Sequence, residues 1–164
     1  MQSWQEQPMQ TLVDQVAAQQ RAHGWALMAI HDCSASHGRA FAYTTGFTTA
    51  LNVPELVVVG LRSRTACRLL NELGERLREM PPEERVRAVV DGATTRHILR
   101  PGVDFLFRAL GTYQEVGHLD LSALVMGRQD FPIIQLVWAD AANHLPTHPK
   151  CDPRVAAMQA WPPR

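Results

Sequence analysis

The stretch FAYTTGFTTALNVPELVVVGL, residues 41–61, holds the two segments that decide the fold of this chain. Its first part, FAYTTGF over 41–47, is rich in aromatic and β-branched residues, which favour β-strands. Its last part, ELVVVGL over 55–61, is a continuous apolar run of the length expected for a buried strand. The link between them is too short for a parallel crossover, so the sequence predicts an antiparallel pair of strands.

The segments on either side of this stretch carry further helix and strand patterns. Residues 9–22 place apolar side chains at helical spacing, and residues 64–79 do so again after Ser63, a residue suited to capping a helix. Leu70 and Leu73 lie on the apolar stripe of the second helix and are predicted to be core residues. The remaining elements that we expect are strands over 25–32, 86–90, 105–110 and 131–140 and a short helix over 119–127.

These elements predict a single α+β domain over residues 1–164. We expect a mainly antiparallel sheet with two or three packed helices, because most connections have hairpin length and only the helix after the third strand offers a crossover. The tail from Asn143 is rich in proline and has little periodicity. It is therefore expected to be an irregular segment on the surface.

The charge balance excludes some partners. Lysine and arginine number 16, as do aspartate and glutamate, so the formal net charge is zero. Nucleic acids and anionic membranes require a basic surface, and neither is expected as a partner. No apolar run approaches the ~18 residues of a membrane span. The N-terminus lacks the features of a secretory signal, so we expect a cytoplasmic protein with three reduced cysteines.

The run HLPTHPKCD, residues 144–152, collects side chains that bind metals. Zinc accepts ligands of the types found at His144, His148, Cys151 and Asp152. The two prolines of the run prevent a regular helix, so the spacing of the histidines loses its geometric meaning. No CxxC or HExxH motif accompanies the run. We expect an ordered irregular segment without a structural metal, and the sequence identifies no cofactor.

A second candidate is the tripeptide HDC, residues 31–33. In a strand, His31 and Cys33 point to the same face, and a thiol beside an imidazole can become a thiolate nucleophile. Side chains two apart lie about 6 to 7 Å from each other along a strand, which is far for a direct hydrogen bond. Catalytic Cys–His pairs usually come from separate segments, so catalysis is the minor interpretation.

The third group of candidate residues lies within the stretch 41–61. Strand alternation places Tyr43 and Thr45 on one face. Gly46 predicts either a backbone conformation that other residues avoid or a close approach by another segment or a ligand. Glu55 is suited to capping a turn, to pairing with an arginine or to acid–base chemistry. One interpretation is structural, with strand pairing and an ion pair. The other is a ligand pocket lined by Tyr43, Thr45 and Glu55, with the tail residues His144 and His148 at its edge.

The same stretch resembles a known family. Tyr43-Thr44 and Gly46 are followed by Pro54-Glu55-Leu56 and an apolar strand, with Gly24-Trp25 upstream and QLVWAD, 135–140, downstream. This set resembles the bacterial family catalogued as domain of unknown function 4262. The resemblance implies a small cytosolic bacterial protein and implies no activity. The tail departs from the family pattern, because a threonine follows Pro146 where an aromatic residue is expected, and Lys150-Cys151 precede the final aspartate where a glycine is expected.

Two classes of function remain open. The first is a non-enzymatic binding domain for a small ligand or a protein partner, which allows a homodimer. The neutral charge, the lack of catalytic motifs and the spare tryptophans favour it. The alternative is a small hydrolytic or thiol-based enzyme with a pocket around Tyr43, Glu55 and the tail histidines. Convergence of these residues on one pocket would favour an enzyme, whereas their dispersal beside an exposed apolar patch would favour binding.

Overall fold

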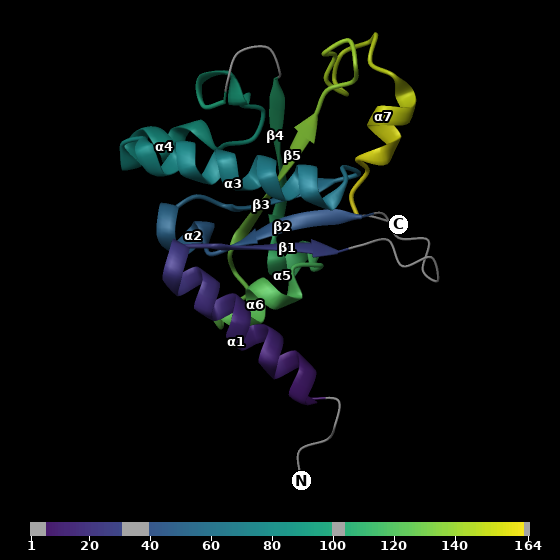
Figure 1. Ribbon diagram of the computed structural model, residues 1–164. Helices are drawn as coiled ribbons and strands as arrows, with labels where there is room; N and C mark the ends of the chain where they lie inside the picture. Colours follow the sequence, from purple (N-terminus) through teal and green to yellow (C-terminus); the bar gives the residue numbers. More distant parts are fainter. Residues whose placement is uncertain (1–5, 31–39, 100–103, 163–164) are drawn as a thin grey trace.

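The computed structural model describes residues 6–30, 40–99 and 104–162 and is built on one five-stranded sheet (Figure 1). The strand order is β1-β2-β3-β5-β4. The pair β3–β5 is parallel and the other three pairs are antiparallel. The predicted α+β class is confirmed, and the sheet is mixed rather than purely antiparallel. The strands are β1 (Ala26–Ile30), β2 (Phe41–Thr45), β3 (Glu55–Val59), β4 (Phe105–Thr112) and β5 (Pro132–Trp138).

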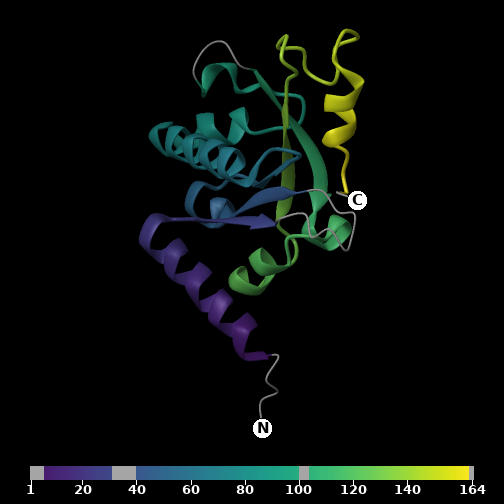
Figure 2. The same cartoon turned by 45° about the vertical axis from the view of Figure 1, so that its right-hand side comes forward.

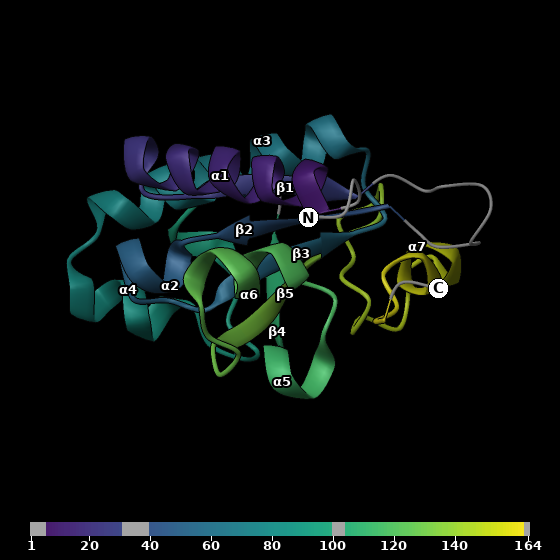
Figure 3. The same cartoon turned by 90° about the horizontal axis from the view of Figure 1, so that it is seen from below.

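Helices cover both faces of the sheet (Figures 1 and 3). On one face lies α3 (Ser63–Glu79), and on the other lie α1 (Glu6–His23) and α6 (Asp120–Met126). Four short α-helices lie outside these two layers, three of them in connections and one after β5. None of the helices in the described residues is both long and apolar enough to cross a membrane. The short helices are α2 (Phe47–Leu51), α4 (Pro82–Ala88), α5 (Tyr113–Val116) and α7 (Pro153–Met158).

Each face of the sheet has its own core. On the α3 face, Leu70 and Leu73 are fully buried, as predicted from the apolar stripe of this helix, and pack with Leu56 and Phe107. On the α1 and α6 face, Tyr43, Val57 and residues of α6 form a second cluster. The two faces are both apolar because β2 and β3 are central strands, which must bury side chains on both sides.

Two predicted elements differ from the structure. The strand expected over 86–90 is wrong, because α4 runs through most of it. Pro82 at the first position and acidic residues in the first turn favour this helix, and Val86 and Val90 are exposed. The tail is irregular only as far as Asp152, whose side chain accepts a hydrogen bond from the backbone N–H of Arg154 and caps α7.

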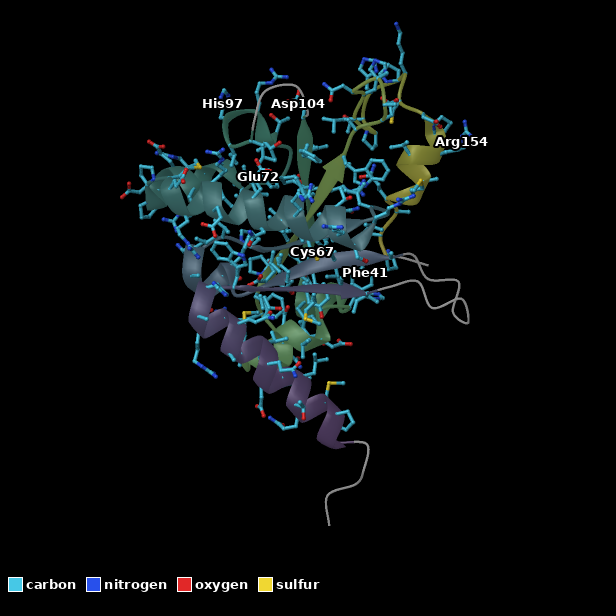
Figure 4. The ribbon with its side chains drawn as sticks, in the orientation of Figure 1. Phe41, Cys67, Glu72, His97, Asp104 and Arg154 are labelled. Carbon is cyan, nitrogen blue, oxygen red and sulfur yellow. The ribbon has the colours of Figure 1, made fainter. Side chains whose placement is uncertain are left out.

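The buried amide of Gln159 docks the segment after α7 onto β5. Its Oε1 accepts from the backbone N–H of Trp138, and its Nε2 donates to the carbonyl oxygen of the same residue, both at 2.8 Å. The side chain of Gln135 donates to the Gln159 carbonyl oxygen at 2.7 Å. These bonds hold Trp161 edge-on against Phe41, the first residue of β2, which is labelled in Figure 4.

Candidate functional site

The carboxylate of Glu55 is the centre of a fully paired buried corner. Its Oε1 accepts from the backbone N–H groups of Gly46 and Thr48, both at 3.0 Å. Its Oε2 accepts from the Thr44 hydroxyl at 2.5 Å and from the backbone N–H of Phe47 at 3.3 Å. The carboxylate thus serves the N–H groups at the start of α2, which would otherwise lack partners. We call these five residues the Glu55 corner.

Two opposing effects act on the pKa of Glu55 in the Glu55 corner. Burial raises the pKa of the Glu55 carboxyl above its ordinary value, and the hydrogen bonds from Thr44, Thr48, Gly46 and Phe47 counteract that rise. All four partners donate, so both carboxylate oxygens act as acceptors. The Thr44 hydroxyl in turn accepts from the backbone N–H of Leu56 at 2.9 Å. This arrangement occupies Glu55 in holding β2, α2 and β3 together.

Gly46 turns the chain from β2 into α2. Its φ of 114° lies in the region that side chains disfavour, and a Cβ there would stand 2.7 Å from the carbonyl oxygen of Gly24. The prediction for Gly46 is confirmed in both of its forms, an unusual backbone conformation and a close approach by another segment. The motif residues from Tyr43 to Glu55 therefore encode a tight structural junction.

Thr45 joins α6 to the sheet. The hydroxyl of Ser122 donates to the carbonyl oxygen of Thr44 at 3.1 Å, and the hydroxyls of Thr45 and Ser122 lie 2.6 Å apart. Because the single Ser122 proton is used by Thr44, Thr45 donates the second bond. Thr45 and Ser122 are both fully buried. This network fixes the position of α6 on β2.

A groove of about 400 Å³ opens beside α6, on the same face of the sheet. Its floor contains Phe41, Tyr43 and Leu121, which are buried. Its walls are apolar and open to solvent, with Leu124 at 56% and Met9 at 52% exposed. We call this hollow the groove. Its described lining residues are Met9 and Leu12 of α1, Met28 and Ile30 of β1, Phe41 and Tyr43 of β2, His118, and Asp120, Leu121 and Leu124 of α6.

The groove owes its open wall to the path of α1. Val16 anchors this helix in the core, but the N-terminal half extends beyond the sheet (Figure 2). Met9 and Leu12 continue the apolar stripe of α1 into this half, where their side chains are exposed. The predicted face of the helix is therefore correct, and its outer end forms part of the groove.

Three polar side chains stand among the groove residues, those of Tyr43, His118 and Asp120. Burial, together with the nearby charge of Asp120, raises the pKa of Tyr43 to about 12. Tyr43 therefore stays a neutral phenol near neutral pH. The hydroxyl of Tyr113 donates to Oδ1 of Asp120 at 2.6 Å and orients that carboxylate.

His118 has an unusual backbone. Its φ is 69°, in the left-handed region that few residues other than glycine adopt, although histidine does so more often than most. Its ring meets Trp161 edge-on, with 5.3 Å between ring centroids. This conformation places the imidazole at the rim of the groove, next to the start of α6.

The tail forms a separate hydrogen-bonded turn around Asp140. Its carboxylate accepts from the backbone N–H groups of Ala142, His144 and Asp152 at 2.8 to 3.0 Å. Bonds from His144 and Asp152 hold the pKa of Asp140 below its ordinary value. The rings of His144 and His148 stack with 4.4 Å between centroids, and Nδ1 of His148 accepts from the Lys150 N–H. The segment is ordered and irregular, as predicted.

The structure separates most of the candidates that the sequence grouped together. Tyr43 lines the groove, but Thr45, Glu55, His144 and His148 are not among its described lining residues. Within the described ranges, no group of three or more histidine, cysteine or acidic side chains is placed to hold a metal ion. The pair His31 and Cys33 lies outside the described residues, so its proposed chemistry stays a prediction.

Sequence patterns do not reveal most of the groove residues. In the sequence, Met28, Ile30, Leu121 and Leu124 are only parts of strands or of a short helix. The usable signal is the apolar stripe of α1, which continues through Met9 although the helix is near the chain start. His118 and Asp120 belong to no motif, because their meaning depends on contacts with β2 and Trp161.

Comparison with known proteins identifies one family. The family model described as "Domain of unknown function (DUF4262)" matches residues 19–152, which confirms the resemblance seen in the sequence. The match contains the Glu55 corner and all described groove residues except Met9 and Leu12. No curated protein and no solved structure matches the chain. The description assigns no activity.

Proposed function

We propose that this chain, which belongs to the family described as Domain of unknown function (DUF4262), is a binding domain that takes a small, mainly apolar molecule into the groove. The observation that carries the proposal is the clustering of exposed apolar side chains there. A cytoplasmic location and a bacterial source stay predictions from the sequence, as does the expectation that nucleic acids and membranes are not partners.

Exposed apolar side chains are common singly but uncommon in groups. Seven large apolar side chains of the described residues are exposed, and four of them, Met9, Leu12, Ile30 and Leu124, meet in the groove. Such a patch with a few polar groups around it is characteristic of binding surfaces. An occupant would remove this surface from water, at about 25 cal/mol per Å² of apolar area.

The size and lining of the groove favour a small molecule. Its volume of about 400 Å³ falls within the range of roughly 300 to 1,000 Å³ that ligand pockets occupy. The aromatic rings of Phe41 and Tyr43 stack with 6.0 Å between their centroids, and these buried side chains form the floor of the groove. Met9 and Met28 have flexible side chains that adapt to the shape of a ligand. A rigid floor with adaptable walls suits an apolar molecule of modest size.

The enzyme alternative has less support. It requires Tyr43, Glu55 and a tail histidine to meet in one pocket, and only Tyr43 is among the described residues of the groove. Glu55 accepts four hydrogen bonds from its own chain and is fully buried. A group with this environment stabilises the fold and has no acceptor position directed to a substrate.

The proposal is tested with the neutral apolar dye Nile red and a matched pair of variants. Leu124→Ser changes an exposed side chain of the groove, and Val86→Ser changes an exposed side chain of α4, outside the groove. We expect a fluorescence increase with the native chain and about threefold to tenfold weaker binding by Leu124→Ser, because part of the buried apolar area is lost. Val86→Ser is expected to bind like the native chain.

Sedimentation of the same proteins separates a small ligand from a second copy as the occupant. We expect the mass in solution to be the same for the native chain and Leu124→Ser. Equal dye binding by all three proteins would contradict the proposal. A native dimer that Leu124→Ser converts to a monomer would contradict it as well, since the groove would then be an interface between copies.

A further inference from the structure

We infer that the ligand of the groove carries a cationic group, such as an ammonium, beside its apolar body, and that the carboxylate of Asp120 receives it. The inference rests on the proposed function, because it concerns the chemistry of the molecule bound at the same site. It follows from the sign of the charge at the groove, the orientation of the carboxylate and the aromatic floor.

The fixed charge at the groove is negative. Asp120 is the one acidic side chain among the described lining residues, and no lysine or arginine is among them. None of the ion pairs formed between described residues includes Asp120. A neighbouring hollow that Asp120 and Leu124 also line contains Arg128, but this guanidinium pairs with Asp130 at 2.6 Å.

The Asp120 carboxylate is held in place with acceptor capacity left over. The hydroxyl of Tyr113 donates to its Oδ1 at 2.6 Å. A carboxylate has two oxygens and about four acceptor positions, so one such bond orients the group without saturating it. Asp120 contrasts in this respect with Glu55, whose oxygens each accept two bonds from the chain.

The floor of the groove adds a second attraction for a cation. The rings of Phe41 and Tyr43 stack at 6.0 Å with 23° between their planes. Aromatic faces attract ammonium groups within about 6 Å of the ring centre. Because Tyr43 stays a neutral phenol, it contributes a ring and a hydroxyl without a charge of its own. A ligand with an apolar body and a cationic group would thus meet both an aromatic floor and the Asp120 carboxylate in one site.

The test uses three eight-carbon probes, octylammonium, octanol and octanoate, each measured by displacement of Nile red. The native chain is expected to bind octylammonium about threefold to tenfold more tightly than octanol, as one solvent-accessible charge pair allows, and to bind octanoate most weakly. The preference should shrink as salt is added, because salt screens exposed charges. Asp120→Asn should abolish the preference, so that octylammonium and octanol bind with similar affinity.

Two further variants separate the charge of Asp120 from its place in the fold and from the imidazole of His118. Asp120→Ser repeats the loss of charge with a residue that also suits a helix start, which covers the case in which Asp120→Asn does not fold. His118→Gln replaces the imidazole at the rim of the groove with an uncharged side chain, and it should keep the preference for octylammonium. These expectations all concern the difference between probes, which a purely structural role of Asp120 would not change.

The outcomes separate the two proposals. Binding of all three probes with equal affinity, or a preference for octylammonium that survives in both Asp120 variants, would overturn the inference and leave the binding function intact. Failure of the native chain to bind any probe or the dye would overturn the proposed function, and the inference with it. Loss of the preference in the Asp120 variants alone would support both.

Discussion

The Glu55 corner and the groove share strand β2 and have opposite character. In the corner, a buried carboxylate accepts four hydrogen bonds, and the backbone of Gly24 leaves no room for a side chain at Gly46. In the groove, Met9 and Leu124 leave half of their surface in water. A saturated buried site stabilises a fold, whereas an unsaturated open one is available to a partner.

This difference warns against equating a sequence motif with an active site. The tyrosine-threonine-x-glycine and proline-glutamate-leucine segments hold the clearest pattern in the chain, and the structure explains that pattern by a helix cap and a tight turn. The groove, which the proposal makes functional, is assembled from four separate segments with no common motif. The comparison predicts that changes in the corner affect stability and that changes in the groove affect binding.

The largest effect is expected from Glu55→Ala. It removes four hydrogen bonds and leaves buried N–H groups without acceptors, so unfolding free energy should fall by about 3 to 5 kcal/mol. Chemical denaturation measures the loss. Glu79→Ala is the control, because this exposed glutamate forms a surface pair with Arg76 at 3.7 Å and should change stability by less than about 0.5 kcal/mol. Similar stability of the two variants would mean that the corner does not hold β2, α2 and β3 together.

A somewhat smaller effect is expected from Gly46→Ala. The new Cβ would meet the Gly24 carbonyl oxygen at 2.7 Å, and φ is 114°, so we expect a loss of about 2 to 4 kcal/mol. Gly92→Ala separates the two causes, because Gly92 also has a positive φ of 79° but open space around it. Thermal or chemical unfolding should show a loss of about 1 kcal/mol for Gly92→Ala. Equal losses of stability in Gly46→Ala and Gly92→Ala would mean that the close approach of Gly24 does not contribute.

Tyr43 lines the groove and is also buried, so its alkaline titration should affect the stability of the fold. Its folded pKa of about 12 lies above the ordinary value of 10.0, so the folded state binds the phenol proton more tightly than the unfolded state. Stability from this group is complete below pH 10 and is lost as pH rises towards 12, by about 2 to 3 kcal/mol in total. Denaturation at a series of alkaline pH values should show this loss.

Tyr43→Phe supplies the control for the alkaline experiment. The chain has two tyrosines, and the bond to Asp120 also raises the pKa of the other one, Tyr113. Ultraviolet absorbance of tyrosinate in Tyr43→Phe therefore reports Tyr113 alone. If the variant loses stability as steeply as the native chain between pH 10 and 12, burial of Tyr43 is not the cause.

The central part of the fold is predictable from the sequence. The strands around 41–45 and 55–59, their antiparallel pairing and the buried face of α3 follow from patterns that act within a few residues. The special role of Gly46 is predictable for the same reason, since a glycine in a β-rich run is a local signal. The helix α2 is not, because its start depends on a carboxylate from the following strand.

The groove is not predictable in this way, because its residues come together only in the tertiary structure. Met9 and Leu12 have the pattern of core residues, and they are exposed since α1 extends past the sheet. The end of α4 resembles a strand in sequence, because the valines at 86, 89 and 90 favour a strand, while Pro82 and the acidic residues after it set the helix. The docking of α7 depends on Gln159, a residue with no local signal.

The most direct test of the proposed binding site is made on the groove itself. Amide chemical shifts of isotope-labelled chain, followed by NMR during titration with octanol, locate binding without any substitution. We expect saturable chemical-shift changes at Met28, Ile30, Leu121 and Leu124 and unchanged chemical shifts at Thr44 and Glu55. Saturable shifts confined to the tail histidines His144 and His148, or no shifts at all, would contradict the proposed binding site.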